Sequence, residues 1–298
     1  MPLERNCAIC PRRCGVDRSI QTGICGVREL PRVARAMLHR WEEPCISGTR
    51  GSGTVFFSGC PLKCCFCQNH DISAGAEGKD VPVTRLAEIF LELQGQGAHN
   101  INLVSPTHFA RQIAEALRQA KANGLTLPVA WNSGGYDSSE GLALVDGQVD
   151  IYMPDIKYIN SDRSRKYSGA ADYFAAASKA IPEMARQVGP ARFDEDGIMQ
   201  KGLLIRHLVM PGGVSDSIAI LDWVAATLGT ESVVISLMSQ YMPCHRSAEY
   251  PEINRKITSL EYGKVLDHYD KLGFKLGYCQ QKSSASAQFV PEFNKQGV

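Results

Sequence analysis

The sequence has no excess of charge of either sign and no long apolar run. Among 298 residues, 32 lysines and arginines are balanced by 31 aspartates and glutamates. A nucleic-acid-binding surface needs a basic excess or a basic stripe, so this balance argues against DNA or RNA as a partner. No apolar run approaches the length of a membrane span, and residues 1–7 lack the apolar core of a signal peptide. We therefore expect neither a nucleic-acid partner nor a membrane partner.

Cysteine, by contrast, is abundant. The chain has 11 cysteines in an otherwise ordinary composition that is 44% hydrophobic and 21% charged. Most of these cysteines fall into two groups in the first part of the chain. In a chain of this size, grouped cysteines indicate metal or redox chemistry more often than disulfides.

The second group forms a C-x3-C-x2-C loop made by Cys60, Cys64 and Cys67. It directly follows an apolar run, residues 54–57, that is typical of a buried strand. Three thiolates can hold three irons of a 4Fe–4S cluster, which ordinarily uses four. The fourth iron is then open, and an open metal position distinguishes a reactive site from a structural one. S-adenosylmethionine (SAM) can chelate that iron through its amino and carboxylate groups, and the aromatic Phe66 suits packing against its adenine ring.

This loop resembles the signature of the radical SAM superfamily, C-x3-C-x-aromatic-C placed after a strand. The resemblance implies a cluster that injects one electron into the SAM sulfonium and releases a 5′-deoxyadenosyl radical. The alternatives are three chance cysteines or a zinc knuckle that borrows a fourth ligand. A further thiol in the loop, Cys65, is expected to be a small buried side chain. Because an oxygen-sensitive cluster requires a reducing compartment, we expect a cytoplasmic protein.

The first group places four cysteines in a C-x2-C-x3-C-x10-C pattern formed by Cys7, Cys10, Cys14 and Cys25. Four thiolates this close in sequence can form a closed site, which would be structural because no ligand position is left open. A zinc ion and a second 4Fe–4S cluster both suit four thiolates, and the spacing does not separate them. An empty site is the third alternative, but so small a segment with few apolar residues needs some cross-link to fold.

From residue 54 onward, short apolar runs alternate with amphipathic stretches. The runs are rich in Val, Ile or Leu and are bounded by turn residues, as buried parallel strands are. They cover residues 54–58, 101–105, 127–131, 150–155, 203–209 and 233–237. The predicted helices cover residues 84–93, 108–122, 169–188, 216–228 and 260–272. Six strand–helix units imply right-handed crossovers and a parallel sheet.

Six units are too few to close an eight-stranded barrel. We therefore predict an α/β fold, a partial (β/α)6 barrel of the radical SAM type with a small N-terminal cysteine-rich metal-binding segment. The predicted divisions are residues 1–48 for that segment, 49–282 for the barrel and 283–298 for a C-terminal tail. Residues 283–288 are low in apolar content and are expected to form a loop, with Phe289, Val290 and Phe293 docking the tail.

Polar residues follow the predicted strands at the ends where parallel α/β folds bind ligands. We predict ten cofactor-binding residues: Phe66, Ser105, Thr107, His108, Asn132, Gly134, Asp155, Lys157, Arg206 and His207. Asp155 and Lys157 are two apart on a strand and face the same side, so they form an internal salt bridge, a ligand clamp or both. In the clamp, Lys157 pairs with the SAM carboxylate while Asp155 holds a hydroxyl or a cation. Simpler alternatives are a turn for Gly134, a satisfied core position for His207 and a surface position for His108.

Several of these strings resemble the pyruvate formate-lyase activating enzyme family over roughly residues 40–280. Asp155-Ile156-Lys157 is similar to the family's D-x-K motif. Asn132 begins an Asn-Ser-Gly-Gly string where the family has a Thr-Asn-Gly turn, and Arg206 leads into a Pro-Gly pair as in the family's fifth-strand motif. The leading cysteines, together with residues 39–48, resemble a less characterised branch of these activating proteins.

The resemblance implies an enzyme that abstracts a hydrogen atom from a glycine of a partner enzyme and leaves a glycyl radical there. It also implies a flavodoxin or a ferredoxin as the electron donor. The chain departs from the pattern in two places. Ser105-Pro106-Thr107-His108 stands where most superfamily members carry Gly-Gly-Glu to hold the SAM amino group. Four N-terminal cysteines stand in place of an inserted eight-cysteine ferredoxin module.

We therefore predict a radical SAM enzyme that reductively cleaves SAM and abstracts a hydrogen atom from a protein or peptide, with activation of a glycyl radical enzyme as the specific hypothesis. Within the class, the alternative is modification of a peptide or a small molecule. Outside it, the alternative is a non-catalytic iron–sulfur electron carrier, which would not cleave SAM. A zinc-ribbon nucleic-acid binder is disfavoured by the near-neutral charge.

Overall fold

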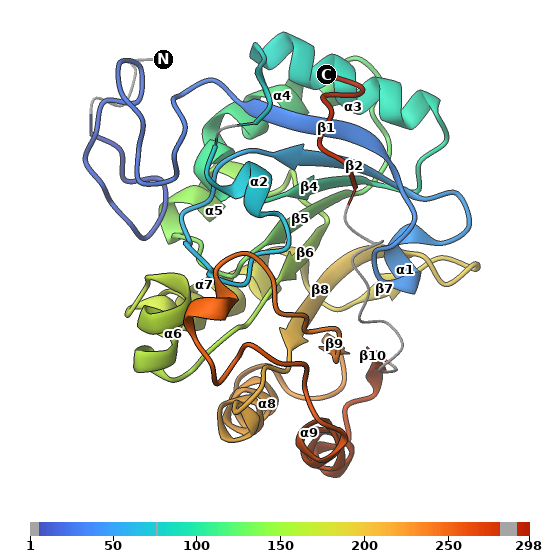
Figure 1. Cartoon of the computed structure of the whole chain (residues 1–298). Helices are drawn as coiled ribbons and strands as arrows, with labels where there is room; N and C mark the ends of the chain where they lie inside the picture. Colours follow the sequence, from blue (N-terminus) through green and yellow to red (C-terminus); the bar gives the residue numbers. More distant parts are fainter. Residues whose placement is uncertain (1–5, 76, 281–290) are drawn as a thin grey trace.

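Seven parallel strands form the centre of the molecule. The structure, a computed structural model, describes residues 6–75, 77–280 and 291–298. The parallel strands are β2 (Ser52–Phe57), β4 (Ile101–Val104), β5 (Val129–Ser133), β6 (Ile151–Pro154), β8 (Met199–Leu208), β9 (Val234–Met238) and β10 (Leu276–Cys279). They lie side by side in chain order and form a curved, open sheet (Figure 1). The predicted α/β fold with a partial barrel of parallel strands is confirmed.

The six predicted apolar runs each overlap one of these strands, and β10 is a seventh that the sequence did not predict. The cause is visible at Gly277, inside β10. A side chain at Gly277 would lie 2.4 Å from the carbonyl oxygen of Ile235 in the neighbouring strand β9. The close packing of these two strands requires glycine, and a glycine inside a short strand weakens the sequence signal.

Antiparallel strands extend the sheet beyond β2. β1 (Arg32–His39) pairs with β2, and β3 (Lys79–Asp80) pairs with β1. β7 (Arg192–Phe193) pairs with the start of β8. β1 is thus part of the main sheet although it lies in the segment 1–48, and the predicted division after residue 48 stays a prediction.

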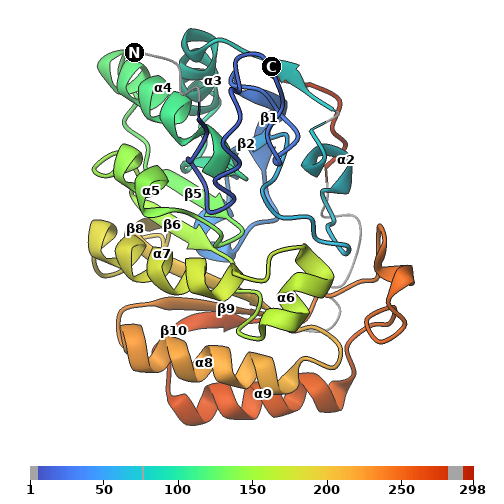
Figure 2. The ribbon, with the colours of Figure 1, turned by 90° about the vertical axis from the view of Figure 1, so that its left-hand side faces the viewer.

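The longer helices cover the outer face of the parallel strands (Figure 2). They are α3 (Val83–Gly95), α4 (Ala110–Ala122), α5 (Ser139–Val145), α7 (Tyr173–Val188), α8 (Val214–Leu228) and α9 (Ser259–Leu272). Local chemistry sets their ends. Thr258 and Glu261 form a reciprocal capping box that starts α9. Gly124, with a φ of 97°, follows the last residues of α4 and lets the chain turn away.

Two predicted helices begin too early in the sequence. Residues 169–172 do not belong to α7, because Gly169 adopts a left-handed backbone with a φ of 63° and ends the preceding helix α6 (Ser161–Ser168). The start of the predicted helix 108–122 is a 3-10 turn, η1 (Thr107–Phe109). The single-turn helices α1 (Pro44–Ser47), α2 (His70–Ser73) and η2 (Ser247–Glu249) are too short to show helical periodicity in the sequence.

Helix α1 closes the barrel at the N-terminal ends of its strands. Cys45 and Ile46 of α1 are buried there in an apolar cluster. The cluster also contains Ala130, Ile151, Met153, Met199, Leu204 and Val234 from the strands. The side chain of Asn100 holds α1 in place by donating to the carbonyl oxygen of Ile46 (2.8 Å). Polar ligands therefore have their place at the opposite end, where the carboxyl ends of the strands point.

Residues 291–298 lie beside β1. The amide of Lys295 donates to the carbonyl oxygen of Ala34 (3.0 Å), and the amide of Ala36 donates to that of Gln296 (2.9 Å). The ring of Phe293 contacts that of Phe56, with 5.5 Å between centroids, so the predicted docking of Phe293 is confirmed. The predicted loop 283–288 and the predicted contacts of Phe289 and Val290 lie outside the described residues. Among the described residues, no helix combines the length and the apolar character that a bilayer crossing requires.

Candidate cluster and cofactor site

The loop that follows β2 carries the three motif cysteines and is held on both sides by backbone hydrogen bonds. The amide of Cys60 donates to the carbonyl oxygen of Cys25 in the N-terminal segment (3.0 Å), and the amide of Cys65 donates to that of Tyr167 in α6 (2.8 Å). Gly59 has a φ of 84°, and a side chain there would lie 2.8 Å from the same Cys25 oxygen. Glycine at this position lets the N-terminal segment approach the loop closely.

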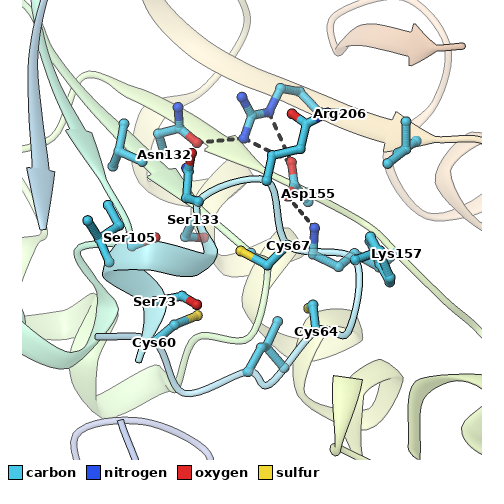
Figure 3. Close-up of a pocket in the computed structure, with 18 of the residues that line it drawn as sticks. Cys60, Cys64, Cys67, Ser73, Ser105, Asn132, Ser133, Asp155, Lys157 and Arg206 are labelled. Atoms are coloured by element: carbon cyan, nitrogen blue, oxygen red, sulfur yellow. Dashed lines mark hydrogen bonds and ion pairs between the residues drawn. The ribbon is translucent and has the colours of Figure 1, made fainter. Parts of the chain in front are cut away.

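The three cysteines line one cavity of about 250 Å³ at the carboxyl ends of the parallel strands. Figure 3 shows the side chains of Cys60, Cys64 and Cys67 arranged around the same space. Seven of the ten predicted cofactor residues line this cavity too: Phe66, Ser105, Asn132, Gly134, Asp155, Lys157 and Arg206. Cys65 does not line it and is fully buried, as expected of a small apolar side chain.

The lining residues come from neighbouring strands whose pairing continues past the strand ends. The amide of Ser105, just after β4, donates to the carbonyl oxygen of Asn132 in β5 (2.9 Å). The amide of Asp155, just after β6, donates to the carbonyl oxygen of Ser133 (2.9 Å), and Asp155 forms a parallel bridge with Arg206 on β8. The backbone ladder therefore fixes the spacing of these side chains around the cavity.

A largely buried series of alternating charges, with side chains 10–18% exposed, runs along the cavity wall (Figure 3). Lys157 Nζ lies 2.6 Å from Asp155 Oδ2, and Asp155 Oδ1 accepts from Arg206 Nε at 3.0 Å. Arg206 Nη2 donates to Asn132 Oδ1 (2.5 Å), while Arg206 Nη1 lies 3.4 Å from Glu42 Oε2. Each charge has a neighbour of opposite sign, which is the condition for burying charges without a large penalty.

For Asp155 and Lys157, the attraction between opposite charges affects the pKa more than burial does. Burial acts to raise the pKa of Asp155, but Arg206 and Lys157 lower it below its usual value. Burial acts to lower the pKa of Lys157, but Asp155 raises it above its usual value. Glu42 differs, because burial raises the pKa of its carboxyl and Arg206 offsets only part of that effect. At neutral pH the cavity wall therefore presents a charged lysine beside a charged aspartate.

Sequence reasoning missed Glu42, which joins the network from the segment between β1 and α1. Its Oε1 accepts from the side-chain amides of Asn102 (3.2 Å) and Asn132 (3.3 Å). The available signal was a pair of consecutive carboxylates, Glu42 and Glu43, directly before the proline that starts α1. Two adjacent acids beside a buried helix start require partners, and Arg206 is one of them.

Three predicted cofactor residues, Thr107, His108 and His207, are not among the residues that line the cavity. The Thr107 hydroxyl donates to Asp137 Oδ1 (2.7 Å), and His108 Nε2 lies 2.9 Å from the carbonyl oxygen of Ser58. His207 contacts the Ile156 carbonyl oxygen through Nδ1 (2.7 Å) and Ser217 Oγ through Nε2 (2.8 Å). All three side chains are buried, and burial lowers the pKa of His108 to about 3. In the structure these side chains bond to the protein itself; His207 fits the alternative of a satisfied core histidine, whereas His108 is buried and does not lie at the surface.

The four N-terminal cysteines come together in a small region beside the cluster loop. A side chain built at Gly23 would lie 3.4 Å from the Cys14 sulfur and 3.2 Å from the Cys25 sulfur. Burial raises the pKa of Cys10 to about 12, and the neighbouring thiols of Cys25, Cys7 and Cys14 add to this effect. Cys7, Cys10 and Cys25 are only 5–6% exposed. We call these four residues the N-terminal quartet.

A protein from Methanocaldococcus jannaschii decides the family. Uncharacterized protein MJ0674 is 31% identical to the chain over 286 residues, which cover 93% of the chain and 78% of that protein. The chain belongs to the MJ0674 family. Within it, residues 47–163 match the family described as a 4Fe-4S single cluster domain. That range contains the three motif cysteines together with Asp155 and Lys157.

Solved structures resemble this member of the MJ0674 family at a lower level. Streptococcus suis SuiB bound to S-adenosylmethionine is 14% identical, with a TM-score of 0.49, and the match covers 74% of this chain and 48% of that one. SuiB bound to the precursor peptide SuiA is 13% identical, with a TM-score of 0.49 over 74% of this chain and 46% of that one. A domain of a pyruvate-formate lyase-activating enzyme from Bacteroides vulgatus is 11% identical, with a TM-score of 0.40 over 58% of this chain and 91% of that one. The chain thus spans less than half the length of SuiB.

The cavity of this MJ0674-family chain fits the donor set of a 4Fe–4S cluster with one open iron. Three cysteines and no fourth are among the residues that line it. Burial raises the pKa of Cys60 and of Cys67 to about 12, and neighbouring motif cysteines add to it; a bound metal centre deprotonates such thiols. Across the described ranges, no three Cys, His, Asp or Glu side chains converge tightly enough to hold a single metal ion.

Proposed function

We propose that this protein is a radical SAM enzyme that holds a 4Fe–4S cluster on Cys60, Cys64 and Cys67 and takes a hydrogen atom from a protein or peptide. The proposal depends on one observation, a cavity that places three thiols beside the buried pair of Lys157 and Asp155. Cys60, Cys64 and Cys67 would hold the cluster there, and the chemistry it would supply is one-electron reductive cleavage of SAM, with methionine and 5′-deoxyadenosine as products and a radical left on the substrate.

The charged wall of the cavity suits the amino-acid end of SAM. Lys157 is the proposed partner of the SAM carboxylate, because its ammonium is charged and its side chain is only 18% exposed. In so enclosed a place, bulk water weakens an ionic contact little. Asp155, kept ionised by Arg206, is the proposed acceptor for the SAM amino group or a ribose hydroxyl. Asp155 thereby offers the amino group a partner in a chain that lacks Gly-Gly-Glu after its second predicted strand.

Phe66 is the proposed contact for the adenine ring. Its side chain lines the cavity, is 7% exposed and packs against Tyr241, with 5.8 Å between ring centroids. A ring held in this way offers a fixed face for stacking. Ser105, Asn132 and Gly134 complete the proposed cofactor wall from the ends of β4 and β5.

The proposed specific reaction is activation of a glycyl radical enzyme, with a flavodoxin or ferredoxin as electron donor and the cytoplasm as its compartment. It is supported by the resemblance of Asp155-Ile156-Lys157 and of Arg206 to motifs of the activating enzymes. Incubation with a candidate partner enzyme and SAM should give a glycyl radical signal in electron paramagnetic resonance. Deuterium carried from a labelled peptide into 5′-deoxyadenosine, with no glycyl radical formed, would favour peptide modification instead.

We also propose that the N-terminal quartet binds a second metal centre, either zinc or a second 4Fe–4S cluster. Its support is that the thiols of Cys7, Cys14 and Cys25 lie near Cys10 and that three of the four residues are almost fully buried. The four thiols would still have to draw closer together to enclose a metal ion. Metal analysis of a variant with Cys60, Cys64 and Cys67 all changed to alanine would identify the metal. About four residual irons per chain would indicate a cluster, and about one residual zinc would indicate a structural ion. A metal-free variant would refute the second site.

The test of the main proposal is reduction of the reconstituted protein with dithionite in the presence of SAM, followed by detection of 5′-deoxyadenosine. We expect this product from the wild-type protein and a loss of at least about tenfold in Lys157→Met, because one ionic contact to SAM is removed. Lys166→Met is the matched control, since Lys166 lies on α6 with a half-exposed side chain paired with Glu252. If the protein carried a full cluster but formed no 5′-deoxyadenosine, the proposed enzyme activity would be refuted, and the alternative of a non-catalytic electron carrier would be favoured.

A further inference from the structure

A second cavity, of about 420 Å³, lies beside the cofactor cavity. Residues 41–44 line one side of it, and β8, β9, β10 and the residues that follow them line the other. The two cavities share Arg206, Met238 and Gln240 in their walls. Ligand pockets in proteins commonly measure about 300–1,000 Å³. We call this second cavity the inner chamber, and it places a ligand-sized space next to the proposed site of SAM cleavage.

The inner chamber contains one more carboxylate than the neighbouring cations balance. In the network described above, Lys157 and Arg206 offset Asp155 and Glu42. Glu43 is a third carboxylate, 8% exposed, and no ion pair joins it to any other described residue. Burial raises the pKa of Glu43 and the neighbouring Glu42 adds to this, while Arg206 and the nearby Ser236 hydroxyl offset it only in part, so burial favours the neutral acid until a cation is present. A buried acid in this situation is costly until a cation reaches it.

Other side chains of the chamber wall also suit a cation. Ser236 is 1% exposed and lies near the Glu43 carboxylate, yet its hydroxyl has no hydrogen-bond partner of acceptable geometry among the described residues. Trp41 and Tyr278 add aromatic rings to the lining, and ring faces attract cations. A protonated amine or a guanidinium carries several N–H donors and can satisfy both the carboxylate and the open serine oxygen.

We propose that the inner chamber binds the substrate through a positively charged amine or guanidinium group, with Glu43 as its counter-ion. This inference rests on the proposed function, since it takes the neighbouring cavity as the place where SAM is cleaved. A substrate anchored at Glu43 extends past Met238 and Gln240, the two uncharged side chains that both cavities share. The anchor therefore selects the substrate while a different part of it reaches the cofactor cavity.

The experiment measures binding to the reconstituted full-length protein by isothermal titration calorimetry in the presence of SAM. Three probes are compared: the peptide acetyl-Gly-Lys-Gly-amide, its norleucine counterpart, and 1,5-diaminopentane. We expect the lysine peptide to bind at least about tenfold more tightly than the norleucine peptide, because only lysine carries the charge. Diaminopentane that binds as tightly as the lysine peptide would assign the cation to a small-molecule substrate, and weaker binding would assign it to a peptide.

Glu43→Gln should abolish the preference for lysine, whereas Glu231→Gln, at an exposed position, should retain it. Thermal unfolding reports whether each variant is folded, and Ser236→Ala, with a smaller expected loss, serves if Glu43→Gln does not fold. Equal binding of the two peptides, no binding of any cationic probe, or an undiminished preference in the folded variant would overturn the proposal. Formation of 5′-deoxyadenosine without any charge preference would refute the inner chamber alone. A preference that depends on Glu43, without formation of 5′-deoxyadenosine, would refute the proposed function alone.

Discussion

The two cysteine groups of this chain place the same side chain in opposite surroundings. Cys60, Cys64 and Cys67 line a cavity together with charged residues from the strand ends. Cys7, Cys10 and Cys25 of the N-terminal quartet are almost completely covered. Both groups have the short spacings of metal ligands, so spacing alone does not separate them. The difference teaches that neighbouring elements decide whether a thiol group is open to a ligand or closed.

The two groups also touch, so a change in one can be used to test the other. The carbonyl oxygen of Cys25 accepts from the amide of Cys60, and Arg12 Nε donates to the carbonyl oxygen of Pro61 (2.7 Å). A side chain at Gly26 would lie 2.3 Å from the carbonyl oxygen of Ala74, just after α2. The N-terminal segment therefore packs directly against the cluster loop. We expect variants of the cluster loop to lose activity and variants of the quartet to lose stability.

The largest effect is expected from removing one thiol of the cluster loop. Cys64→Ala should lower 5′-deoxyadenosine formation by at least about 100-fold, because three thiols are the minimum donor set for the cluster. The thermal midpoint of the metal-free chain should change little, since Cys64 is only partly buried at the edge of the core and alanine removes a single sulfur atom. Cys65→Ala is the matched control, because Cys65 is buried outside the cavity and should keep its iron. If Cys64→Ala kept the wild-type iron content, Cys64 would not be a cluster ligand, and the proposed difference in role between the two cysteine groups would be wrong.

An intermediate effect is expected from the closed group. Cys10→Ala should destabilise the folded protein by about 3 kcal/mol, which corresponds to about 6–12 °C in the thermal midpoint, because a metal tie is lost from a segment with little apolar core. Differential scanning calorimetry together with metal analysis measures both quantities. An unchanged midpoint with full metal content would contradict the assignment of the quartet as a structural site.

The effect that is smallest near neutral pH concerns the junction of the two regions, where His108 lies. Its ring contacts the carbonyl oxygen of Ser58 before the cluster loop, and its own carbonyl oxygen accepts from Arg18 of the N-terminal segment. Burial lowers the pKa of His108 from 6.5 to about 3, so below pH 6.5 the unfolded chain binds a proton that the folded chain does not. The free energy of unfolding should therefore decrease as the pH is lowered from 6.5 towards 3. His108 contributes up to about 1.4 kcal/mol to this decrease per pH unit.

The measurement is urea unfolding of the wild type and of His108→Gln between pH 7 and 4. The variant retains a side-chain hydrogen-bond donor but cannot titrate, so its stability should fall less steeply with pH. The contributions of the other histidines are the same in both proteins and cancel in the comparison. Equal slopes for the two proteins would show that His108 is not buried as a neutral side chain.

The sequence predicted the parts of the site whose partners are close along the chain. Cys60, Cys64 and Cys67 lie on one loop, and Asp155 and Lys157 lie two residues apart on one strand, where alternation places them on the same face. Glu42 was not predictable in this way. It meets Asn132 and Arg206 across separations of 90 and 164 residues, and only the folded sheet brings these three side chains together.

The predictions for Thr107, His108 and His207 show a different limit. A position after a strand indicates that a residue is near the ligand end of the sheet, but it does not tell which way the side chain points. Ser105 has a φ of 59°, so the chain turns sharply there, and the next residues lead into η1 with Thr107 and His108 buried. His207 follows Arg206 on β8, so the alternation of strand residues sends the two side chains to opposite faces.

The hydrogen bond between the Cys60 amide and the Cys25 carbonyl oxygen has a consequence for the maturation of the protein. The position of Cys60 thus depends on a backbone contact from the N-terminal segment. If both proposed metal centres form, a quartet that stays open would displace Cys25 and, through this contact, one of the three thiols of the proposed cluster. Loading of the proposed cluster would then respond to the supply of the metal that the quartet binds.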